Sequence, residues 1–82
     1  MAVRAYILIE TEVGSARNVA SHILAMRRDN AEVKSVDTVT GPYDVIVYME
    51  AADLDALGDA LSEGIQAVHG VKRTTTCLAV RL

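Results

Sequence analysis

The chain contains no tryptophan, no phenylalanine and only three tyrosines among its 82 residues. Nucleic-acid-binding proteins commonly stack bases on aromatic side chains and neutralise phosphates with a basic surface. Here aromatic residues make up 4% of the chain, and the formal net charge is −3. The composition therefore argues against direct binding of DNA or RNA.

Cysteine is almost absent as well, since Cys77 stands alone. A lone thiol cannot form an intramolecular disulfide, whereas small secreted domains usually carry several cysteines. The N-terminal residues lack the charged start and long apolar core of a signal peptide, and no stretch approaches the roughly 20 apolar residues of a membrane span. These absences predict a soluble cytoplasmic protein without membrane association.

Hydrophobic residues make up 51% of the chain and charged residues 23%, a balance typical of a folded domain. Because independently folding units seldom fall far below 100 residues, we expect residues 1–82 to form one domain. A chain of this length buries only about 63% of its unfolded surface when it folds alone. Association with a second copy would bury more surface and so increase the stability of the fold.

Four β-prone segments are recognisable by their β-branched and alternating apolar residues. They cover residues 3–11, 32–40, 43–50 and 71–82. The dipeptide Gly41-Pro42 separates the second segment from the third, because glycine frees the backbone and proline fixes φ. We expect these two segments to form an antiparallel hairpin around a tight turn.

Two amphipathic helices are predicted between the strands. Apolar residues recur at helical spacing after Ser15, up to about Asp29-Asn30, and again from Leu54 to His69 behind the N-cap Asp53. The resulting order, βαββαβ, predicts an α+β fold of the ferredoxin-like type with a four-stranded antiparallel sheet. Gly58 and Gly64 interrupt the second helix, and close approach of a neighbouring segment would explain them.

Both faces of the predicted sheet carry apolar side chains, although two helices can cover only one of them. We assign the purely aliphatic set of positions to the helices and the set with tyrosines to the open face, because tyrosine suits a partly wet interface. The open face then comprises Tyr6, Leu8, Ile46, Tyr48, Leu78 and Val80. This pattern predicts a homodimer joined sheet to sheet; the reverse assignment of faces and a hydrophobic ligand cavity remain alternatives.

Residues suited to catalysis or metal binding are scarce. Cys77 falls inside a predicted strand, where a thiol usually acts as a small hydrophobe. His22 and His69 lie on different predicted helices without cysteine or carboxylate at ligand spacing. We therefore predict no catalytic residue, no metal and no cofactor.

Two polar segments remain, the hairpin turn Thr40-Gly41-Pro42-Tyr43-Asp44 and the run Thr74-Thr75-Thr76. The turn has a structural explanation, in which Asp44 binds a backbone N–H. The three consecutive hydroxyls put donors and acceptors on both faces of a strand. Together, the two segments offer the mixture of groups that a small zwitterion requires.

The chain resembles the C-terminal effector domain, or RAM domain, of the Lrp/AsnC transcription regulators. The resemblance rests on Val39-Thr40-Gly41-Pro42-Tyr43-Asp44, on Asp53 with Leu57, and on Gly70-Val71-Lys72-Arg73-Thr74-Thr75-Thr76. It implies an amino-acid-sensing domain that pairs sheet to sheet and assembles dimers into an octamer or another ring. Effectors would bind between dimers.

The resemblance also assigns roles to five residues. Gly41, Tyr43 and Asp44 match the hairpin element, with the backbone near Gly41 holding the effector's carboxylate and Asp44 its ammonium. Thr74 and Thr76 match the closing element and would complete the polar shell. The identity of the effector stays open.

A full-length regulator of this type carries an N-terminal helix-turn-helix arm, which this sequence lacks, so the chain resembles a stand-alone effector domain. It could co-assemble with full-length Lrp/AsnC regulators. Three other classes share features with the sequence. They are a dimeric ferredoxin-like barrel enzyme of the monooxygenase or isomerase type, an ACT-like regulatory domain, and an oligomerisation module without ligand.

Overall fold

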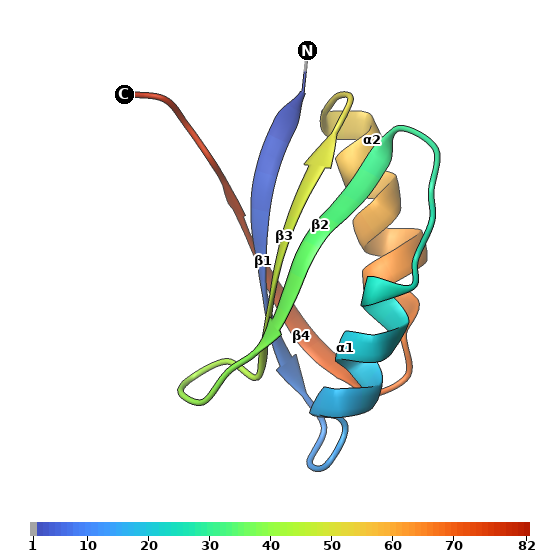
Figure 1. Cartoon of the computed structure of the whole chain (residues 1–82), viewed down its shortest axis with the longest axis vertical. Coiled ribbons are helices and arrows are strands. Elements are labelled where there is room, and N and C mark those ends of the chain that lie inside the picture. Colours follow the sequence, from blue (N-terminus) through green and yellow to red (C-terminus); the bar gives the residue numbers. More distant parts are fainter. Residues whose placement is uncertain (1) are drawn as a thin grey trace.

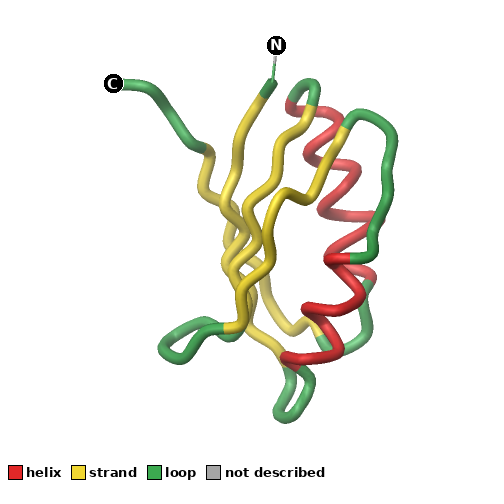
Figure 2. Tube along the Cα trace, viewed as in Figure 1, coloured by secondary structure: helices red, strands yellow, loops and turns green. Residues whose placement is uncertain are grey.

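A computed structural model describes residues 2–82 (Figure 1). The elements, in order, are β1 (Val3–Thr11), α1 (Ala16–Leu24), β2 (Ala31–Thr38), β3 (Val45–Ala51), α2 (Leu54–Asp59), η1 (Ala60–Gly64), η2 (Ile65–Ala67) and β4 (Val71–Leu78). The strands form one antiparallel sheet in the order β2-β3-β1-β4. Figure 2 shows all helical segments on one side of this sheet. The predicted ferredoxin-like α+β fold is confirmed.

The core lies between the sheet and the helical layer, where the predicted aliphatic sets of β1 and β3 point. From Ala5 to Ile9 in β1 and along the whole of β3, every second residue is fully or almost fully buried because it faces the helices. The buried strand residues are Ala5, Ile7, Ile9, Val45, Val47, Met49 and Ala51, and the buried helical residues are Val19, Ile23, Leu57, Ala60 and Ile65. The helix-facing assignment is therefore correct for both central strands.

Helix α1 is shorter than predicted, because it ends at Leu24 instead of near Asp29-Asn30. The Arg27 guanidinium folds back and donates hydrogen bonds to the carbonyl oxygens of Leu24 and Met26, at 3.1 and 2.8 Å. Met26 still packs against the core, but it does so from the loop after the helix. Because the core-packed residue Met26 follows at helical spacing, the apolar pattern in the sequence continues past Leu24, where the helix itself ends.

The second helical segment changes its pitch. It begins as predicted, since the N-cap Asp53 accepts a 2.8 Å hydrogen bond from the backbone N–H of Ala56. It then passes from α2 through the π-helical turn η1 into the 3₁₀ turn η2. The predicted close approach is confirmed at Gly64, where a Cβ atom would lie 2.5 Å from Cε of Met26, but not at Gly58, where none is within 4 Å.

Strand β4 has the opposite phase from the predicted one. Its pairing with β1 sets Leu78 opposite Ala5 and Cys77 opposite Tyr6. Because paired residues share a face of the sheet, Leu78 lies on the helix-covered side and Cys77 on the open face, where its side chain is exposed. The assignment of Leu78 to the open face was therefore wrong. Val80 lies beyond the end of the strand and is 70% exposed.

The hairpin between β2 and β3 is confirmed, although its loop is longer than a tight turn because the strands stop at Thr38 and resume at Val45. This loop projects away from the helices, toward the open side of the sheet (Figure 1). The C-terminal residues leave the sheet on that same side, at its other end. Within residues 2–82, no helix combines the length and apolar character needed to cross a membrane.

Candidate functional site

Asp44 ties the hairpin loop to the end of β1. Its Oδ2 atom accepts a 2.8 Å hydrogen bond from the backbone N–H of Thr11, and its own N–H donates to the carbonyl oxygen of Ile9, also at 2.8 Å. The backbone N–H of Val39 closes the loop by donating to the Asp44 carbonyl at 2.9 Å. Asp44 thus has the structural role considered from the sequence. Only one of its carboxylate oxygens takes part in a hydrogen bond among the described residues.

The loop presents an open backbone at Gly41. This residue is exposed and has a φ of +139°, a conformation that residues with side chains rarely adopt. No atom lies within 4 Å of the position a Cβ would take, so the glycine is needed for its backbone geometry rather than for space. The neighbouring Tyr43 is half-buried. Polar backbone groups at this tip are therefore accessible to a ligand.

Thr74 and Thr76 lie on the other side of the sheet from the projecting loop. They pair with Ile9 and Ile7, so their side chains share the helix-covered face of the edge strand β4. The Thr74 hydroxyl accepts a 2.9 Å hydrogen bond from the side-chain amide of Gln66. Strand β1 separates β4 from the hairpin strands. A single copy therefore does not bring the five predicted ligand residues together into one pocket.

The open face of the sheet carries an apolar patch in its centre. The patch consists of two cross-strand pairs, Tyr6 with Tyr48 and Leu8 with Ile46. The tyrosine rings are tilted by 34° with centroids 4.9 Å apart, and Tyr6 is 43% exposed. These four residues are called the open-face patch below.

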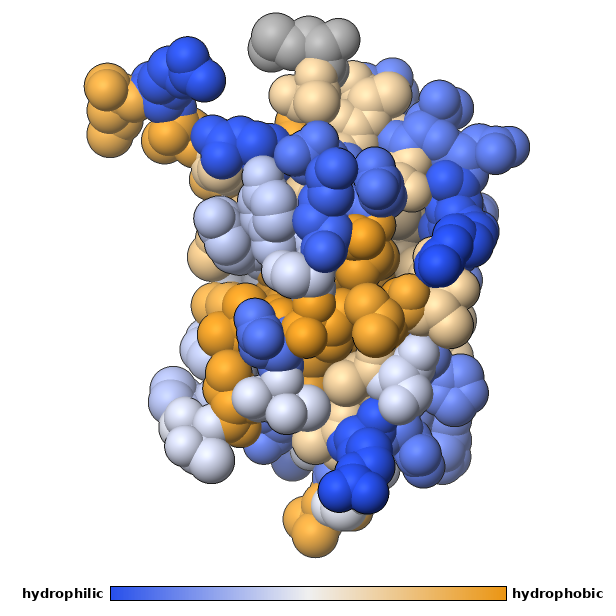
Figure 3. Space-filling model, viewed as in Figure 1, coloured by the Kyte–Doolittle hydropathy of each residue, from blue (hydrophilic) through white to orange (hydrophobic). Residues whose placement is uncertain are grey.

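The borders of the open face are polar. Arg73 lies 3.8 Å from the Glu10 carboxylate at one end, and the Tyr48 hydroxyl donates to Glu50 at 3.3 Å toward the other. Figure 3 views the molecule from the β2 side of the sheet and shows hydrophobic residues across its middle with hydrophilic residues above and below. An apolar centre with a polar rim is the usual anatomy of a protein interface.

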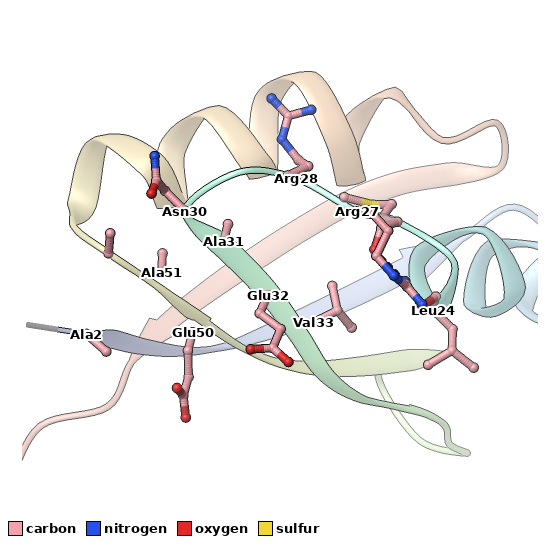
Figure 4. A pocket seen from close by; sticks show the side chains of 12 residues that line it. Ala2, Leu24, Arg27, Arg28, Asn30, Ala31, Glu32, Val33, Glu50 and Ala51 are labelled. Atoms are coloured by element: carbon pink, nitrogen blue, oxygen red, sulfur yellow. Dashed lines mark hydrogen bonds between the residues drawn. The ribbon is translucent and has the colours of Figure 1, made fainter.

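A groove of about 810 Å³ lies at the end of the sheet away from the hairpin loop. It runs along the start of β2, beneath the loop that follows α1 (Figure 4). Its lining includes Leu24, Met26, Arg27, Glu32, Val33 and Glu50. This β2 groove was not predicted, because its walls come from a loop that the sequence pattern assigned to a helix.

Both histidines are exposed and lie on different segments of the chain. His22 is exposed, and its Nδ1 atom lies 2.8 Å from the carbonyl oxygen of Asn18, one helical turn earlier. His69 lies in the turn before β4 and is also exposed. Across residues 2–82, no three His, Cys, Asp or Glu side chains are grouped so that they could hold a metal ion.

Comparison with known proteins identifies the family. The family model described as the Lrp/AsnC ligand binding domain matches residues 4–82. No protein with a curated description gives a significant match.

Several solved structures are similar to the chain. TTHA0845 from Thermus thermophilus shares 31% identity with a TM-score of 0.87, over 98% of this chain and 95% of that protein. The hypothetical protein PHS023 from Pyrococcus horikoshii shares 35% identity with a TM-score of 0.84, over 98% of this chain and 92% of that protein. The regulator NMB0573 from Neisseria meningitidis, solved with L-Met, shares the fold at 20% identity and a TM-score of 0.82, over 96% of this chain and 50% of that one. The chain thus belongs to the Lrp/AsnC ligand-binding domain family.

Proposed function

We propose that the protein senses a small amino acid, which binds between copies of the chain and changes how those copies assemble, without any reaction on the ligand. The observation that carries this proposal is the match of residues 4–82 to a ligand-binding domain of transcription regulators. A relative of the same fold was solved with L-Met, which supports an amino acid as the ligand.

The hairpin loop supports the proposed recognition of a zwitterion. The second carboxylate oxygen of Asp44 is available for an ammonium group, and the exposed backbone near Gly41 can donate to a carboxylate. The bonds that anchor Asp44 to β1 hold its carboxylate in position. Tyr43 lies between Gly41 and Asp44 in the loop.

Thr74 and Thr76 would belong to the same site only if a second copy supplied them. Within one copy they face the helical layer, and the hairpin loop projects away from it. We therefore assign the pocket to a boundary between copies, with the hairpin from one copy and β4 from another. An incomplete site in a single chain also explains how ligand and assembly become coupled.

The open-face patch supports a homodimer joined sheet to sheet as the unit of assembly. Removing apolar surface from water contributes about 25 cal/mol per Å², and the patch is continuous across both central strands. Dimers would then form an octamer or another ring, with the effector favouring one arrangement. In the cytoplasm, full-length Lrp/AsnC regulators are the partners proposed for such an assembly.

Light scattering in the presence of each of the twenty amino acids would identify the effector, and calorimetry would then measure its affinity. The informative variant is Asp44→Asn, because the amide oxygen still accepts from Thr11 N–H while the charge is lost. We expect its affinity to fall by about tenfold or more, as a charge-assisted hydrogen bond becomes neutral.

The matched control is Asp53→Asn, which removes the same charge from a carboxylate that also accepts a backbone N–H. It should bind the effector as the wild type does. Equal affinities for Asp44→Asn and the wild type would remove Asp44 from the site. Failure of all twenty amino acids to bind would contradict the proposed function itself.

A further inference from the structure

Gln66 and Thr74 form a polar pair at the β4 border of the sheet. The side-chain amide of Gln66 donates a 2.9 Å hydrogen bond to the Thr74 hydroxyl, which joins the 3₁₀ turn η2 to strand β4. Strand β4 is the last strand on its side of the sheet. Gln66 is exposed and Thr74 is half-buried. The pair is therefore within reach of a ligand and of a second copy.

The hydrogen bond within the pair leaves one donor and one acceptor. A hydroxyl has one proton and two lone pairs, and a primary amide has two N–H groups and one carbonyl oxygen. The Thr74 oxygen uses a lone pair to accept from Gln66, so its proton can be donated elsewhere, and Gln66 Oε1 can still accept. Within residues 2–82 this hydroxyl and this amide form no other side-chain hydrogen bond. Rotation of the amide by 180° would exchange the two roles and still leave one donor and one acceptor.

The two surfaces that meet at this pair contain no charged residue in the part of the chain that the structure describes. The helix-covered face of β4 continues from Thr74 to Thr76 and Leu78, and η2 consists of Ile65, Gln66 and Ala67. Neither element can supply a counter-ion. A fully charged ligand group would therefore lose hydration here without gaining an ion pair.

The carboxylate of Glu63, in the preceding turn η1, does not change this conclusion. It accepts a 2.8 Å hydrogen bond from the Arg28 guanidinium, so its charge is already paired within the chain. The site beside β4 is thus polar but neutral.

A primary carboxamide is the complement of such a pair. Its carbonyl oxygen can accept from the Thr74 hydroxyl while its NH₂ group donates to Gln66 Oε1. A carboxylate offers acceptors only, so one of its oxygens would face Gln66 Oε1 without a proton between them. An aliphatic side chain offers neither group, and the pair would lose water without replacement when a second copy covers it. This cost makes a hydrogen-bonding site selective.

The two halves of the proposed ligand site then recognise different parts of the effector. The hairpin of one copy holds the ammonium and carboxylate groups, through Asp44 and the backbone near Gly41. The β4 border of another copy, with Gln66 beside Thr74, holds the side chain. Gln66 would thus contact the part of the ligand that differs from one amino acid to the next.

We propose that Gln66 and Thr74 select an effector with a carboxamide side chain, L-asparagine or L-glutamine. Thr74 donates to the carbonyl oxygen of that side chain, and Gln66 accepts from its NH₂ group. The inference rests on the proposed function, in which β4 of one copy completes the site of another. It adds a specificity-determining residue, Gln66, to the predicted ligand residues.

The first measurement compares matched ligands on the wild-type chain by calorimetry. L-Glutamine is compared with L-glutamate and L-methionine, and L-asparagine with L-aspartate and L-leucine, so that each amide has an acid and an aliphatic partner of similar size. The tighter-binding amide should bind about tenfold or more tightly than both of its partners, because two hydrogen bonds are lost in each comparison.

The second measurement repeats the comparison on variants. Gln66→Leu removes the amide at an exposed position and keeps the size of the side chain, so the preference for the amide over its aliphatic partner should fall below about threefold. Thr74→Val removes the other half of the pair and should reduce the preference in the same direction. Circular dichroism verifies that both variants fold.

The matched control is Asn18→Leu, which also replaces an exposed amide by leucine on a helix. Asn18 lies on α1, which packs against β2 at the opposite border of the sheet. This variant should keep the wild-type affinity and preference.

A wild-type chain that binds the acid or the aliphatic partner as tightly as the amide would overturn this inference, and so would an unchanged preference in folded Gln66→Leu. In both cases an amino acid still binds, and the proposed function stands. If none of the twenty amino acids binds, the proposed function fails and this inference fails with it.

Discussion

Replacing Gly70 with alanine tests how the turn before β4 is packed. Gly70 has a φ of +98°, and its carbonyl oxygen accepts a 2.8 Å hydrogen bond from the N–H of Glu12. A Cβ atom built there would lie 2.8 Å from Cβ and 3.1 Å from Oγ of Ser15, and 3.2 Å from Cγ2 of Val19. Both a strained backbone and a steric overlap would therefore result.

The size of the effect follows from these two contributions. A non-glycine residue with such a φ costs about 1–3 kcal/mol. The overlap adds about 1–3 kcal/mol, because Ser15 is held at the start of α1 by hydrogen bonds to Glu12 and Val19, at 3.0 and 2.9 Å, and cannot move freely. We expect Gly70→Ala to lower the free energy of unfolding by about 3 kcal/mol. For a domain of this size, the melting temperature would fall by about 12–24 °C.

The assay is thermal unfolding by circular dichroism, with all variants at one protein concentration because association also stabilises the fold. Gly58→Ala is the matched control, since no atom lies within 4 Å of its Cβ position and its φ is ordinary for a helix. It should raise stability by up to about 1 kcal/mol. A loss below about 1 kcal/mol for Gly70→Ala would refute the reasoning about strain and overlap.

Two further predictions concern the hairpin and the open face. Asp44→Ala leaves the half-buried Thr11 N–H without its acceptor, so we expect a loss of about 1–2 kcal/mol in urea unfolding, whereas Asp44→Asn should lose less than half of that; equal losses would show that the hydrogen bond contributes no stability. Leu8→Asp puts a charge into the open-face patch, so we expect monomers in sedimentation with an unchanged circular dichroism spectrum. If this variant sediments like an oligomeric wild type, the patch is not the interface.

Much of the fold could be predicted because local and long-range signals agree in the central strands. In β1 and β3, aliphatic residues occupy every second position, and the tyrosines mark the other side. The same agreement holds at Asp53, whose side chain caps α2, and at Gly64, which lies against Met26. At such positions the type of residue alone was enough to predict its role in the fold.

Other features depend on contacts that the local pattern does not contain. Three consecutive threonines give no hydropathy phase, so the faces of β4 follow only from its register with β1. Met26 packs on the core from a loop, which lengthened the predicted helix and concealed the β2 groove. The ligand residues remain a prediction, because Asp44 and Thr74 lie on separate parts of one copy and only an assembly could unite them.

The three tyrosines also give the protein a natural optical signal. Tyr6 and Tyr48 form the pair on the open face, and Tyr43 lies in the hairpin loop. No tryptophan is present to mask their emission. The whole intrinsic fluorescence of this chain thus originates at the surfaces assigned to association and to ligand, and none of it from the buried core. Tyrosine fluorescence of the unlabelled protein can therefore report both association and ligand binding in one experiment.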